Sequence, residues 1–431
     1  MSELALLGGP RTLGTTFPRF QSIGPEEVEA AKRVVLGGVL SQFLGCWHPD
    51  FYGGPAVQAF ERAWERHFDV PYAVTVNSNT SGLIAALGAI GIEPGDEVIV
   101  SPWTMSATAT SILVWNGIPV FADIEDETYN LDPDAIQRNI TPYTRAIVVT
   151  DIFGHPADME AIMALARRHG LKVVEDAAQA PGATYRERYA GTLADVGVFS
   201  LNYHKHIHTG EGGVCVTHDA TLAERLQLIR NHAESVVEEK GVASLANMIG
   251  FNFRLTEIQA AIGLEQLKKL RHIVDERVAA AGRLTRGLAG LEGLRTPVVK
   301  PECTHVYYDY PLRYDAQVTG VPRDRVAEAL SAEGVAVSDR YQNLHLLPMY
   351  QRKIAHGSHG FPWSSDICRR DVSYAKGICP VAEFEQDHRY LGVGLCVHEY
   401  GEQETELVVT AFRKVWRNLD ALKGMAVAGP R

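Results

Sequence analysis

The amino-acid sequence predicts an α/β fold, with a large domain built on a mostly parallel sheet and a smaller C-terminal α+β domain. Short apolar runs rich in β-branched residues recur between residues 72 and 217, with helical stretches between most of them. These runs are apolar on both faces, which is typical of parallel strands covered by helices on both sides. Seven such runs are present, at residues 73–76, 97–100, 119–122, 146–149, 172–174, 196–201 and 213–217.

Two helices are predicted ahead of the sheet, within residues 1–70. The turn Ile23-Gly24-Pro25 starts the first helix, because proline is favoured at the first helical position. The second helix is predicted over residues 57–68, where Phe60 and Trp64 are four residues apart and therefore lie on one face.

A long helix over residues 255–288 is predicted to connect the two domains, because apolar residues recur there at near-helical spacing. We expect residues 1–285 to form the lead-in and the large domain, and residues 286–431 to form the small domain. The small domain is expected to open with a strand over residues 305–312. Its last helix places four apolar side chains on one face: Val408, Phe412, Val415 and Leu419.

The composition indicates a globular enzyme without a nucleic-acid or membrane partner. The 431 residues carry a formal net charge of −11, whereas a nucleic-acid-binding surface needs clustered basic side chains. The sequence shows no signal peptide and no run of about 18 apolar residues, so we expect no membrane span. The six cysteines are scattered without a CxxC pair, so we expect reduced thiols and a cytoplasmic location.

The loop at residues 77–82 follows the first apolar run and leads into a helix. Backbone N–H groups and hydroxyls at a helix start form an anion site, for which phosphate is a suitable guest. Simple capping of the helix is the alternative, because Asn, Ser and Thr all cap well. Further along, Glu175 and Asp176 end the fifth run, where a carboxylate can cap a helix or face a ligand cation.

A single lysine, Lys205, lies in a Gly- and His-rich loop between the last two runs. A lysine amine can form a Schiff base with a carbonyl compound when it is desolvated or near another cation. A solvated surface lysine is the ordinary alternative. The neighbouring His204, His206 and His208 alternate, so an extended strand would place three imidazoles on one face, where they could hold zinc.

Polar residues also precede the long helix. Thr256 can cap this helix, while Asn252 and Arg254 could reach a ligand or a neighbouring subunit, since arginine is well suited to binding carboxylate or phosphate. Capping without any binding role is again the alternative.

Five sequence segments, taken in order, indicate the kind of protein more specifically than any of these features alone. They read GIEPGDEVIV, PVFADIEDETYNLDP, VVEDAAQAPGATY, the Lys205 loop ending in TGEGG, and FNFRLTEIQAAIGLEQL. From about Gly24 to the C-terminus, the chain resembles the DegT/DnrJ/EryC1/StrS family of pyridoxal-phosphate aminotransferases, which act on keto-sugars and keto-cyclitols. The resemblance implies the aspartate-aminotransferase fold (fold type I), with a seven-stranded sheet, and a homodimer with active sites at its interface.

The resemblance also implies roles for individual residues. Lys205 takes the position of the lysine that forms the Schiff base with pyridoxal 5'-phosphate (PLP), and Asp176 would pair with the protonated pyridine nitrogen. Gln179 would lie near the 3-hydroxyl of the cofactor. The phosphate would be held by Asn79, Thr80 and Ser200, and by Asn252 of the partner subunit.

Three positions depart from the family pattern. The phosphate loop commonly reads Ser-Gly-Thr but reads Ser-Asn-Thr at residues 78–80, and asparagine tolerates left-handed backbone better than most residues. The ring-stacking position, usually aromatic, falls on Met105, with Trp103 two residues earlier; a thioether can also contact an aromatic ring. Many members carry histidine after the fourth strand, where this chain has Asp151.

The implied activity is that of a PLP-dependent aminotransferase of amino-sugar or aminocyclitol biosynthesis. Glutamate or glutamine would convert the cofactor to pyridoxamine phosphate, and a ketone on a sugar, nucleotide-sugar or cyclitol would accept the amine. His345 and Tyr350 resemble family residues near the substrate.

Three alternatives remain at this point. A PLP-dependent sugar dehydratase shares the fold but typically replaces the Schiff-base lysine by histidine, so Lys205 favours transamination. A non-catalytic PLP-binding regulator is disfavoured by the acidic composition. A zinc hydrolase would depend on the three alternating histidines.

Overall fold

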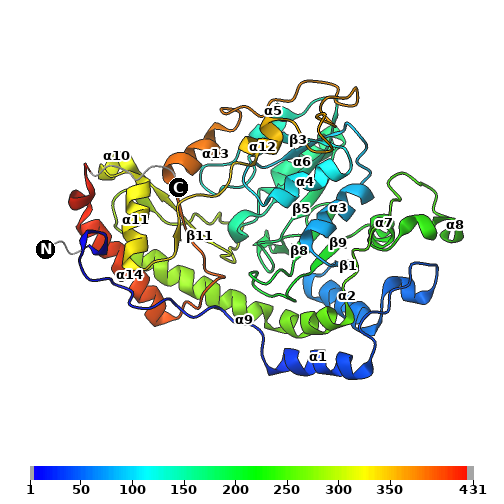
Figure 1. The fold of residues 1–431 in the computed structure, drawn as a ribbon, viewed down its shortest axis with the longest axis horizontal. Helices are drawn as coiled ribbons and strands as arrows, with labels where there is room; N and C mark the ends of the chain where they lie inside the picture. The colour runs from blue at the N-terminus through cyan, green and yellow to red at the C-terminus, as the bar shows by residue number, and fades with distance from the viewer. Residues whose placement is uncertain (1–3, 425–431) are drawn as a thin grey trace.

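A seven-stranded sheet forms the centre of the large domain in the computed structural model, which describes residues 4–424 (Figure 1). Its strand order is β1-β9-β8-β5-β4-β2-β3. The strands are β1 (Tyr72–Val76), β2 (Glu97–Val100), β3 (Ile118–Phe121), β4 (Thr144–Thr150), β5 (Lys172–Asp176), β8 (Val196–Ser200) and β9 (Gly213–Thr217). Each coincides with one of the seven apolar runs, so the predicted fold class is confirmed.

The sheet is mostly parallel. Strand β9 pairs antiparallel with both β1 and β8, whereas the remaining neighbours pair in parallel. The carboxyl ends of β1, β5 and β8 therefore meet at one edge of the sheet. Ligands of open α/β sheets bind at this edge. A separate two-stranded hairpin, β6 (Thr184–Tyr185) and β7 (Arg188–Tyr189), follows β5.

Helices cover both faces of this sheet. Val214 and Val216 of β9 pack in the core with α2 and α9, while Cys215 packs in the opposite core with α3, α4, α6 and α7. This alternation follows from the two-residue period of a strand. The helices are α1 (Pro25–Gly37), α2 (Pro55–Phe68), α3 (Asn79–Ala89), α4 (Ser106–Val114), α5 (Pro133–Asn139), α6 (Met159–His169), α7 (Ala220–Arg230), α8 (Val237–Lys240) and α9 (Glu257–Leu288).

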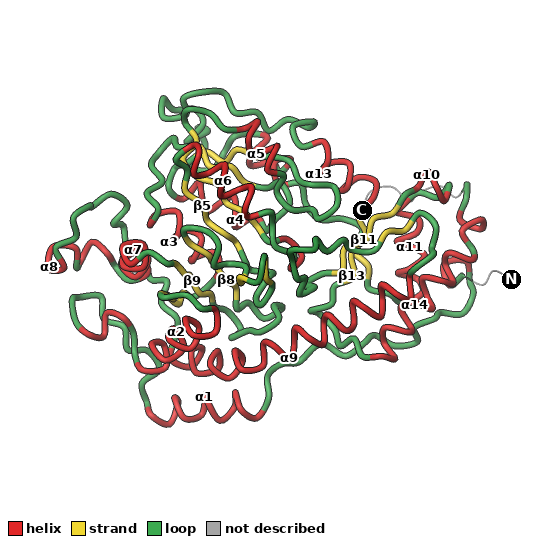
Figure 2. Tube along the Cα trace, turned by 180° about the vertical axis from the view of Figure 1, so that it is seen from behind, coloured by secondary structure: helices red, strands yellow, loops and turns green. Residues whose placement is uncertain are grey.

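Helix α9 passes beneath both domains (Figure 2). It begins at a capping box, in which Thr256 Oγ1 accepts from the Gln259 backbone N–H at 3.3 Å and the Gln259 side chain accepts from the Thr256 N–H at 3.2 Å. Leu270 of α9 is buried in the core of the large domain, and Leu284 is buried in the core of the small domain. The predicted connecting helix and its cap are confirmed.

The small domain holds an antiparallel sheet of order β10-β11-β13-β12. Its elements are β10 (Leu294–Arg295), β11 (Tyr310–Tyr314), α10 (Ala316–Thr319), α11 (Arg323–Glu333), β12 (Val337–Ser338), β13 (Tyr390–Val393) and α14 (Glu402–Arg417). The strand predicted over residues 305–312 was wrong at its start. Tyr307 has a φ of 51°, which a strand cannot accommodate, so residues 305–309 form a loop. Leu419 likewise lies beyond α14, in a 3₁₀ turn.

Between β12 and β13 the chain leaves the small domain and packs along the β3 edge of the large one. This excursion, residues 339–389, contains α12 (Pro348–Gln351) and α13 (Pro380–Phe384), which lie near β3 in Figure 1. Arg370 Nε lies 2.5 Å from Glu97 Oε1, and the Tyr374 hydroxyl donates to the Pro119 carbonyl at 2.8 Å. The excursion therefore ties the two domains together. Among residues 4–424, every helix is too short or too polar to cross a membrane.

Candidate active site

The carboxyl ends of β1, β5 and β8 bring together residues that are far apart in the sequence. Asp176 is the last residue of β5, Ser200 is the last of β8, and Asn79 opens α3 just after β1. Asn79 Nδ2 lies 3.3 Å from both Asp176 Oδ1 and the Val198 carbonyl oxygen, and donates to both. Three of the predicted site residues are thus neighbours.

Asp176 is a buried carboxylate held by several donors. Thr108 Oγ1 donates to Oδ2 at 2.8 Å, and the Ala178 N–H donates to Oδ1 at 3.3 Å. Burial raises the pKa of Asp176, while the hydrogen bond from Thr108 and the positive charge of Lys205 lower it. A carboxylate in this setting is suited to a cationic ligand group, such as a protonated ring nitrogen.

Lys205 is also buried, with 8% of its surface exposed. Its backbone N–H donates to the Asn202 carbonyl at 2.9 Å within the loop between β8 and β9. Burial lowers the pKa of the amine to about 8, and the charge of Asp176 opposes this shift. A desolvated lysine with a lowered pKa is a nucleophile for carbonyl groups, so the surface-lysine alternative is wrong.

Two tyrosines that the sequence analysis did not identify complete this centre. Lys205 Nζ lies 4.2 Å from the ring centroid of Tyr308. Gln179 Nε2 donates to the hydroxyl of Tyr341 at 3.3 Å, while Gln179 Oε1 accepts from the Phe153 N–H at 2.7 Å. Both tyrosines come from the C-terminal third of the chain, so no spacing relative to Lys205 could have revealed them.

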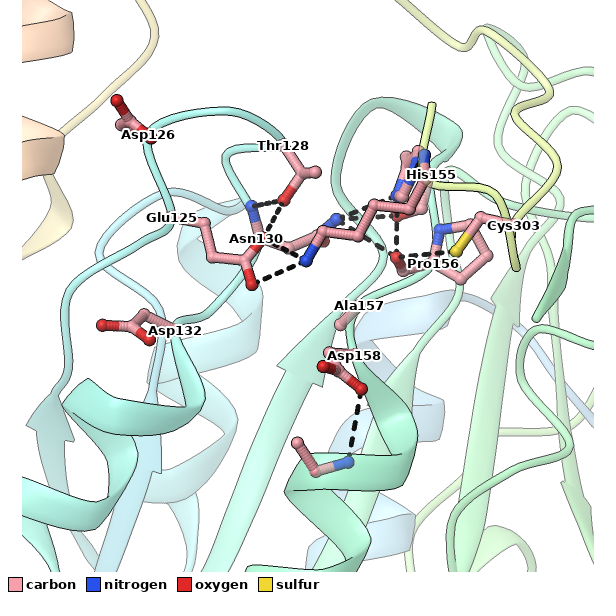
Figure 3. A network of polar contacts seen from close by, with 12 residues as sticks. Glu125, Asp126, Thr128, Asn130, Asp132, His155, Pro156, Ala157, Asp158 and Cys303 are labelled. Carbon is pink, nitrogen blue, oxygen red and sulfur yellow. Dashed lines mark hydrogen bonds and ion pairs between the residues drawn. The ribbon is translucent and has the colours of Figure 1, made fainter. Parts of the chain in front are cut away.

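A polar network lies next to the turn that carries Phe153, and Figure 3 shows its contacts among Asn130, His155 and Pro156. Asn130 Nδ2 donates to the carbonyl oxygens of His155 and Pro156 at 3.1 and 3.3 Å, and Asn130 Oδ1 accepts from the Ile152 N–H at 3.1 Å. Lys300 Nζ lies 2.8 Å from Glu125 Oε1, which closes the network from the linker between the domains. The loops after β3 and β4 therefore hold the backbone N–H of Phe153 in position to donate to Gln179.

The start of α3 combines a cap with an open anion site. Ser78 Oγ accepts from the Ser81 N–H at 3.1 Å, so the capping alternative holds for Ser78. Thr80, on the first turn, is exposed, and Ser200 Oγ accepts from the Asn202 N–H at 3.3 Å. A helix start flanked by hydroxyls suits a phosphate.

The two candidates for ring stacking have separate environments. Trp103 is fully buried, stacks on Tyr129 with ring centroids 5.3 Å apart, and donates to Asn343 Oδ1 at 2.8 Å. Met105 is 65% exposed and precedes α4. Met105 is therefore the one of the two that is free to contact a cofactor ring.

Asn252 lies at the surface. Its Oδ1 accepts from Arg254 Nε at 2.8 Å, and its carbonyl accepts from the Asn77 side chain at 3.3 Å. Its predicted reach into the site of a partner subunit stays a prediction.

His345 and Tyr350 are fully buried at the β3 edge of the sheet. His345 Nε2 lies 2.9 Å from Glu383 Oε1, and Tyr350 packs on Phe121 with ring centroids 5.1 Å apart. Both side chains fill the contact between the excursion and β3, and their predicted role near the substrate stays a prediction.

The three alternating histidines do not converge. His206 is buried and its Nε2 bonds to the Val306 carbonyl at 2.8 Å, whereas His208 Nδ1 accepts from the Gly210 N–H at 3.3 Å. No group of three His, Cys, Asp or Glu side chains in the described part of the chain could hold a metal ion. The zinc alternative therefore has no structural support.

These residues fit PLP: a buried amine for the aldehyde, a buried carboxylate for the ring nitrogen and a helix start for the phosphate. Fold and site together define a fold type I PLP enzyme. The chain belongs to the DegT/DnrJ/EryC1/StrS aminotransferase family, whose model matches residues 48–376. The prediction of an aminotransferase that uses PLP is confirmed.

Individual relatives extend this assignment. The chain is 32% identical to an L-glutamine:2-deoxy-scyllo-inosose aminotransferase of Micromonospora echinospora, over 98% of this chain and 100% of the relative. It is 37% identical to a dTDP-3-amino-3,4,6-trideoxy-alpha-D-glucose transaminase of Streptomyces venezuelae, over 69% of this chain and 76% of the relative. An aminotransferase structure from Psychrobacter cryohalolentis superposes with a TM-score of 0.79 at 28% identity, covering 94% of this chain and 100% of that one.

Proposed function

We propose that this protein transfers the amino group of glutamine to the ketone of a cyclitol, with PLP bound through Lys205. The buried pair of Lys205 and Asp176 at the strand ends is the observation that carries this proposal. The cyclitol enzyme of M. echinospora matches 98% of this chain, whereas the dTDP-sugar enzyme of S. venezuelae matches 69%. The match over nearly the whole length of a glutamine-dependent cyclitol enzyme supports a cyclitol as acceptor.

Four residues besides Lys205 would hold the cofactor. Asp176, oriented by Thr108, would keep the ring nitrogen protonated, and Gln179 would bond near the 3-hydroxyl. Thr80 at the start of α3 and Ser200 at the end of β8 would bind the phosphate. When bound, PLP supplies an electron-withdrawing ring that stabilises negative charge on the carbon that bears the amine.

Lys205 would also move the proton. With its amine free and neutral, Nζ would take the proton from the carbon that bears the donor's amino group and would then give that proton up again in the same site. A pKa of about 8 suits this role, because the amine and ammonium forms are then close in energy near neutral pH. One side chain of fixed reach thus serves both halves of the reaction.

The charged groups around the site support an uncharged acceptor. Arg340, next to Tyr341, lies 3.3 Å from Asp324 and 3.9 Å from Asp339, and Arg254 donates to Asn252. A nucleotide diphosphate would need arginines that are free to bind it, whereas these are already paired. A cyclitol ketone carries no phosphate and makes no such demand.

A homodimer would complete the site. Met105 is 65% exposed beside α4, and an apolar stretch at the end of α1 and just after it is also open, at Val35, Leu36, Val39 and Leu40. Monomeric proteins rarely expose large apolar patches, so a second copy is the occupant we propose, with Asn252 of the partner subunit at the phosphate.

The six cysteines are free thiols, which supports a reducing compartment such as the cytoplasm.

A single-turnover assay tests the proposed reaction. PLP-loaded protein is mixed with glutamine, and then with scyllo-inosose or a dTDP-keto-sugar. We expect glutamine to remove the absorbance of the cofactor aldehyde and scyllo-inosose to restore it, with an aminated cyclitol as product and no response in Lys205→Ala. Restoration by the dTDP-sugar alone would replace the acceptor. Loss of water from the ketone without amination would favour the dehydratase alternative.

A further inference from the structure

The catalytic lysine lies on the face of an aromatic ring. Lys205 Nζ is 4.2 Å from the ring centroid of Tyr308, within the distance at which an ammonium is attracted to the electron-rich face. Tyr308 belongs to the loop before β11, whereas Lys205 belongs to the loop between β8 and β9. The contact therefore joins the small-domain side of the site to the loop between β8 and β9.

The surroundings make this contact strong. Lys205 is 8% exposed, so little water is available to solvate its charge. Cation–π attraction grows when the cation is desolvated. The hydroxyl of Tyr308 is not a candidate base, because burial raises its pKa above the ordinary range for tyrosine. Tyr308 therefore interacts with Lys205 Nζ through the face of its ring.

Other titratable groups near Lys205 lie on four elements. Asp176 on β5 favours the ammonium form of Lys205, as does the buried Cys396 thiol after β13. His204 and His206 on the same loop remain neutral, because burial lowers the pKa of His204 to about 4 and that of His206 to about 3. The positive charge of Arg277 on α9 lowers the pKa of His206 and of Cys396. Asp176 would be occupied by the cofactor ring during the reaction, which leaves the ring of Tyr308 as a partner for Nζ.

We propose that the ring face of Tyr308, and not its hydroxyl, holds Nζ of Lys205 in place and stabilises its ammonium form. This inference rests on the proposed function, in which neutral Nζ accepts a proton, becomes an ammonium and gives the same proton back. By stabilising the ammonium, the ring would keep the proton at Nζ between the two transfers. Tyr308 is then a positioning residue for both steps.

Three substitutions separate ring from hydroxyl. Tyr308→Phe keeps the ring face and removes the oxygen. Tyr308→Leu and Tyr308→Met remove the ring, and methionine preserves much of the volume. Tyr203→Leu is the matched control, because Tyr203 lies in the same loop as Lys205, is 65% exposed and contacts His204.

The pKa of Lys205 in the cofactor-free protein is the decisive measurement. Each protein is treated with trace acetic anhydride over a range of pH, and acetylation of the peptide that contains Lys205 is quantified by mass spectrometry. We expect Tyr308→Phe and Tyr203→Leu to titrate as the wild type does. We expect Tyr308→Leu and Tyr308→Met to titrate about one pH unit lower, a roughly tenfold loss of ammonium over amine.

Two results would overturn the inference. One is an unchanged Lys205 pKa in both ring-less variants; if the leucine variant does not fold, the methionine variant alone decides. The other is a shift in Tyr308→Phe as large as in Tyr308→Leu, which would assign the effect to the hydroxyl. Because the labelling needs no cofactor and no turnover, its outcome is independent of whether the protein transaminates glutamine.

Discussion

Thr108 Oγ1 donates a hydrogen bond of 2.8 Å to Asp176 Oδ2, which joins α4 to the end of β5. The hydroxyls of Thr104 and Thr108 are 2.7 Å apart, and Thr150 Oγ1 donates to Thr104 at 3.1 Å. Since Thr108 donates to the carboxylate, its oxygen accepts from Thr104. Three hydroxyls in a row are thus polarised toward Asp176 and favour its ionised form against the effect of burial.

Replacing Thr108 by valine should therefore weaken cofactor binding. The variant keeps the shape of the side chain but leaves one oxygen of a buried carboxylate without its donor. Hydrogen bonds to charged groups contribute about 1.5–3 kcal/mol, so we expect a roughly tenfold to hundredfold higher Kd for PLP. Absorbance titration of the cofactor-free protein measures it. Thr110→Val, on the same helix, is the control; equal Kd values for both variants would show that Thr108 is dispensable.

Asp151 and Glu175 are buried carboxyl groups at the ends of neighbouring strands. Asp151 Oδ1 accepts from the Ala157 N–H at 3.0 Å and Glu175 Oε2 accepts from the Leu193 N–H at 3.0 Å, while Asp151 Oδ2 and Glu175 Oε1 have no donor among the described residues. Burial, and then the charge of Glu175, raise the pKa of Asp151 well above its ordinary value. This direction favours the protonated form of Asp151 in the folded protein.

This pair should make the wild type less stable as the pH rises. A carboxyl group whose pKa is raised by folding binds more protons in the folded state than in the unfolded state. Its contribution to the free energy of unfolding is therefore complete below about pH 4 and is lost as the pH rises to its folded pKa. Asp151→Asn supplies an amide donor that does not titrate. Between about pH 4 and the folded pKa of Asp151, the wild type should lose stability while the variant does not. We therefore expect the unfolding free energy of the variant, minus that of the wild type, to increase by up to about 1.4 kcal/mol per pH unit.

Urea unfolding at pH 5 and pH 8 measures this difference. The exposed Asp366→Asn provides a control that should follow the wild type at both pH values. If Asp151→Asn loses stability as steeply as the wild type does, folding does not raise the pKa of Asp151.

Arg230 and Glu61 form an ion pair beneath β1. Arg230 is fully buried, its Nη1 lies 2.6 Å from Glu61 Oε1, and it also donates to the Thr75 carbonyl at 3.1 Å. Removing one partner leaves an uncompensated buried charge, so Arg230→Met should lower the free energy of unfolding by about 3–5 kcal/mol. Thermal unfolding of Arg230→Met and of the double variant with Glu61→Gln tests this.

The double variant should recover part of the loss, because it removes the unpaired carboxylate. Lys32→Ala, which breaks an exposed pair with Glu29, should change stability by less than about 1 kcal/mol. A double variant less stable than Arg230→Met would show that the cost is one of packing and not of charge.

The contribution of Asn252 across a dimer interface can be tested by complementation. Lys205→Ala and Asn252→Ala are each expected to be impaired. In a co-expressed mixture, a heterodimer joins intact Lys205 of one subunit to intact Asn252 of the partner subunit. Statistical pairing in a two-fold dimer then restores about a quarter of the wild-type sites. A mixture no more active than its separate components would place Asn252 in the site of its own chain.

The sequence predicted the sheet well because each strand carries a local signal. The seven apolar runs needed no tertiary information, and Thr256 marked the start of α9 through its capping pattern. The strand at residues 305–312 failed because the left-handed backbone of Tyr307 depends on the packing around the site. The excursion at residues 339–389 has no regular period and is stabilised by contacts such as Arg370 with Glu97.

The site was predictable only in part, for the same reason. Lys205 and Asp176 lie in short motifs, so the resemblance located them. Thr108, Tyr308 and Tyr341 reach the centre from elements far away in the chain, and nothing local marks them. His345 and Tyr350 lie in a motif too, but their buried packing at β3 becomes evident only in three dimensions.

Covalent attachment of the cofactor to Lys205 is tested most directly by borohydride reduction of the PLP-loaded protein, followed by proteolysis and mass spectrometry. We expect a pyridoxyl group on the peptide that contains Lys205, in stoichiometric yield. Fully loaded protein that carries the group on another lysine, or on none, would contradict the assignment.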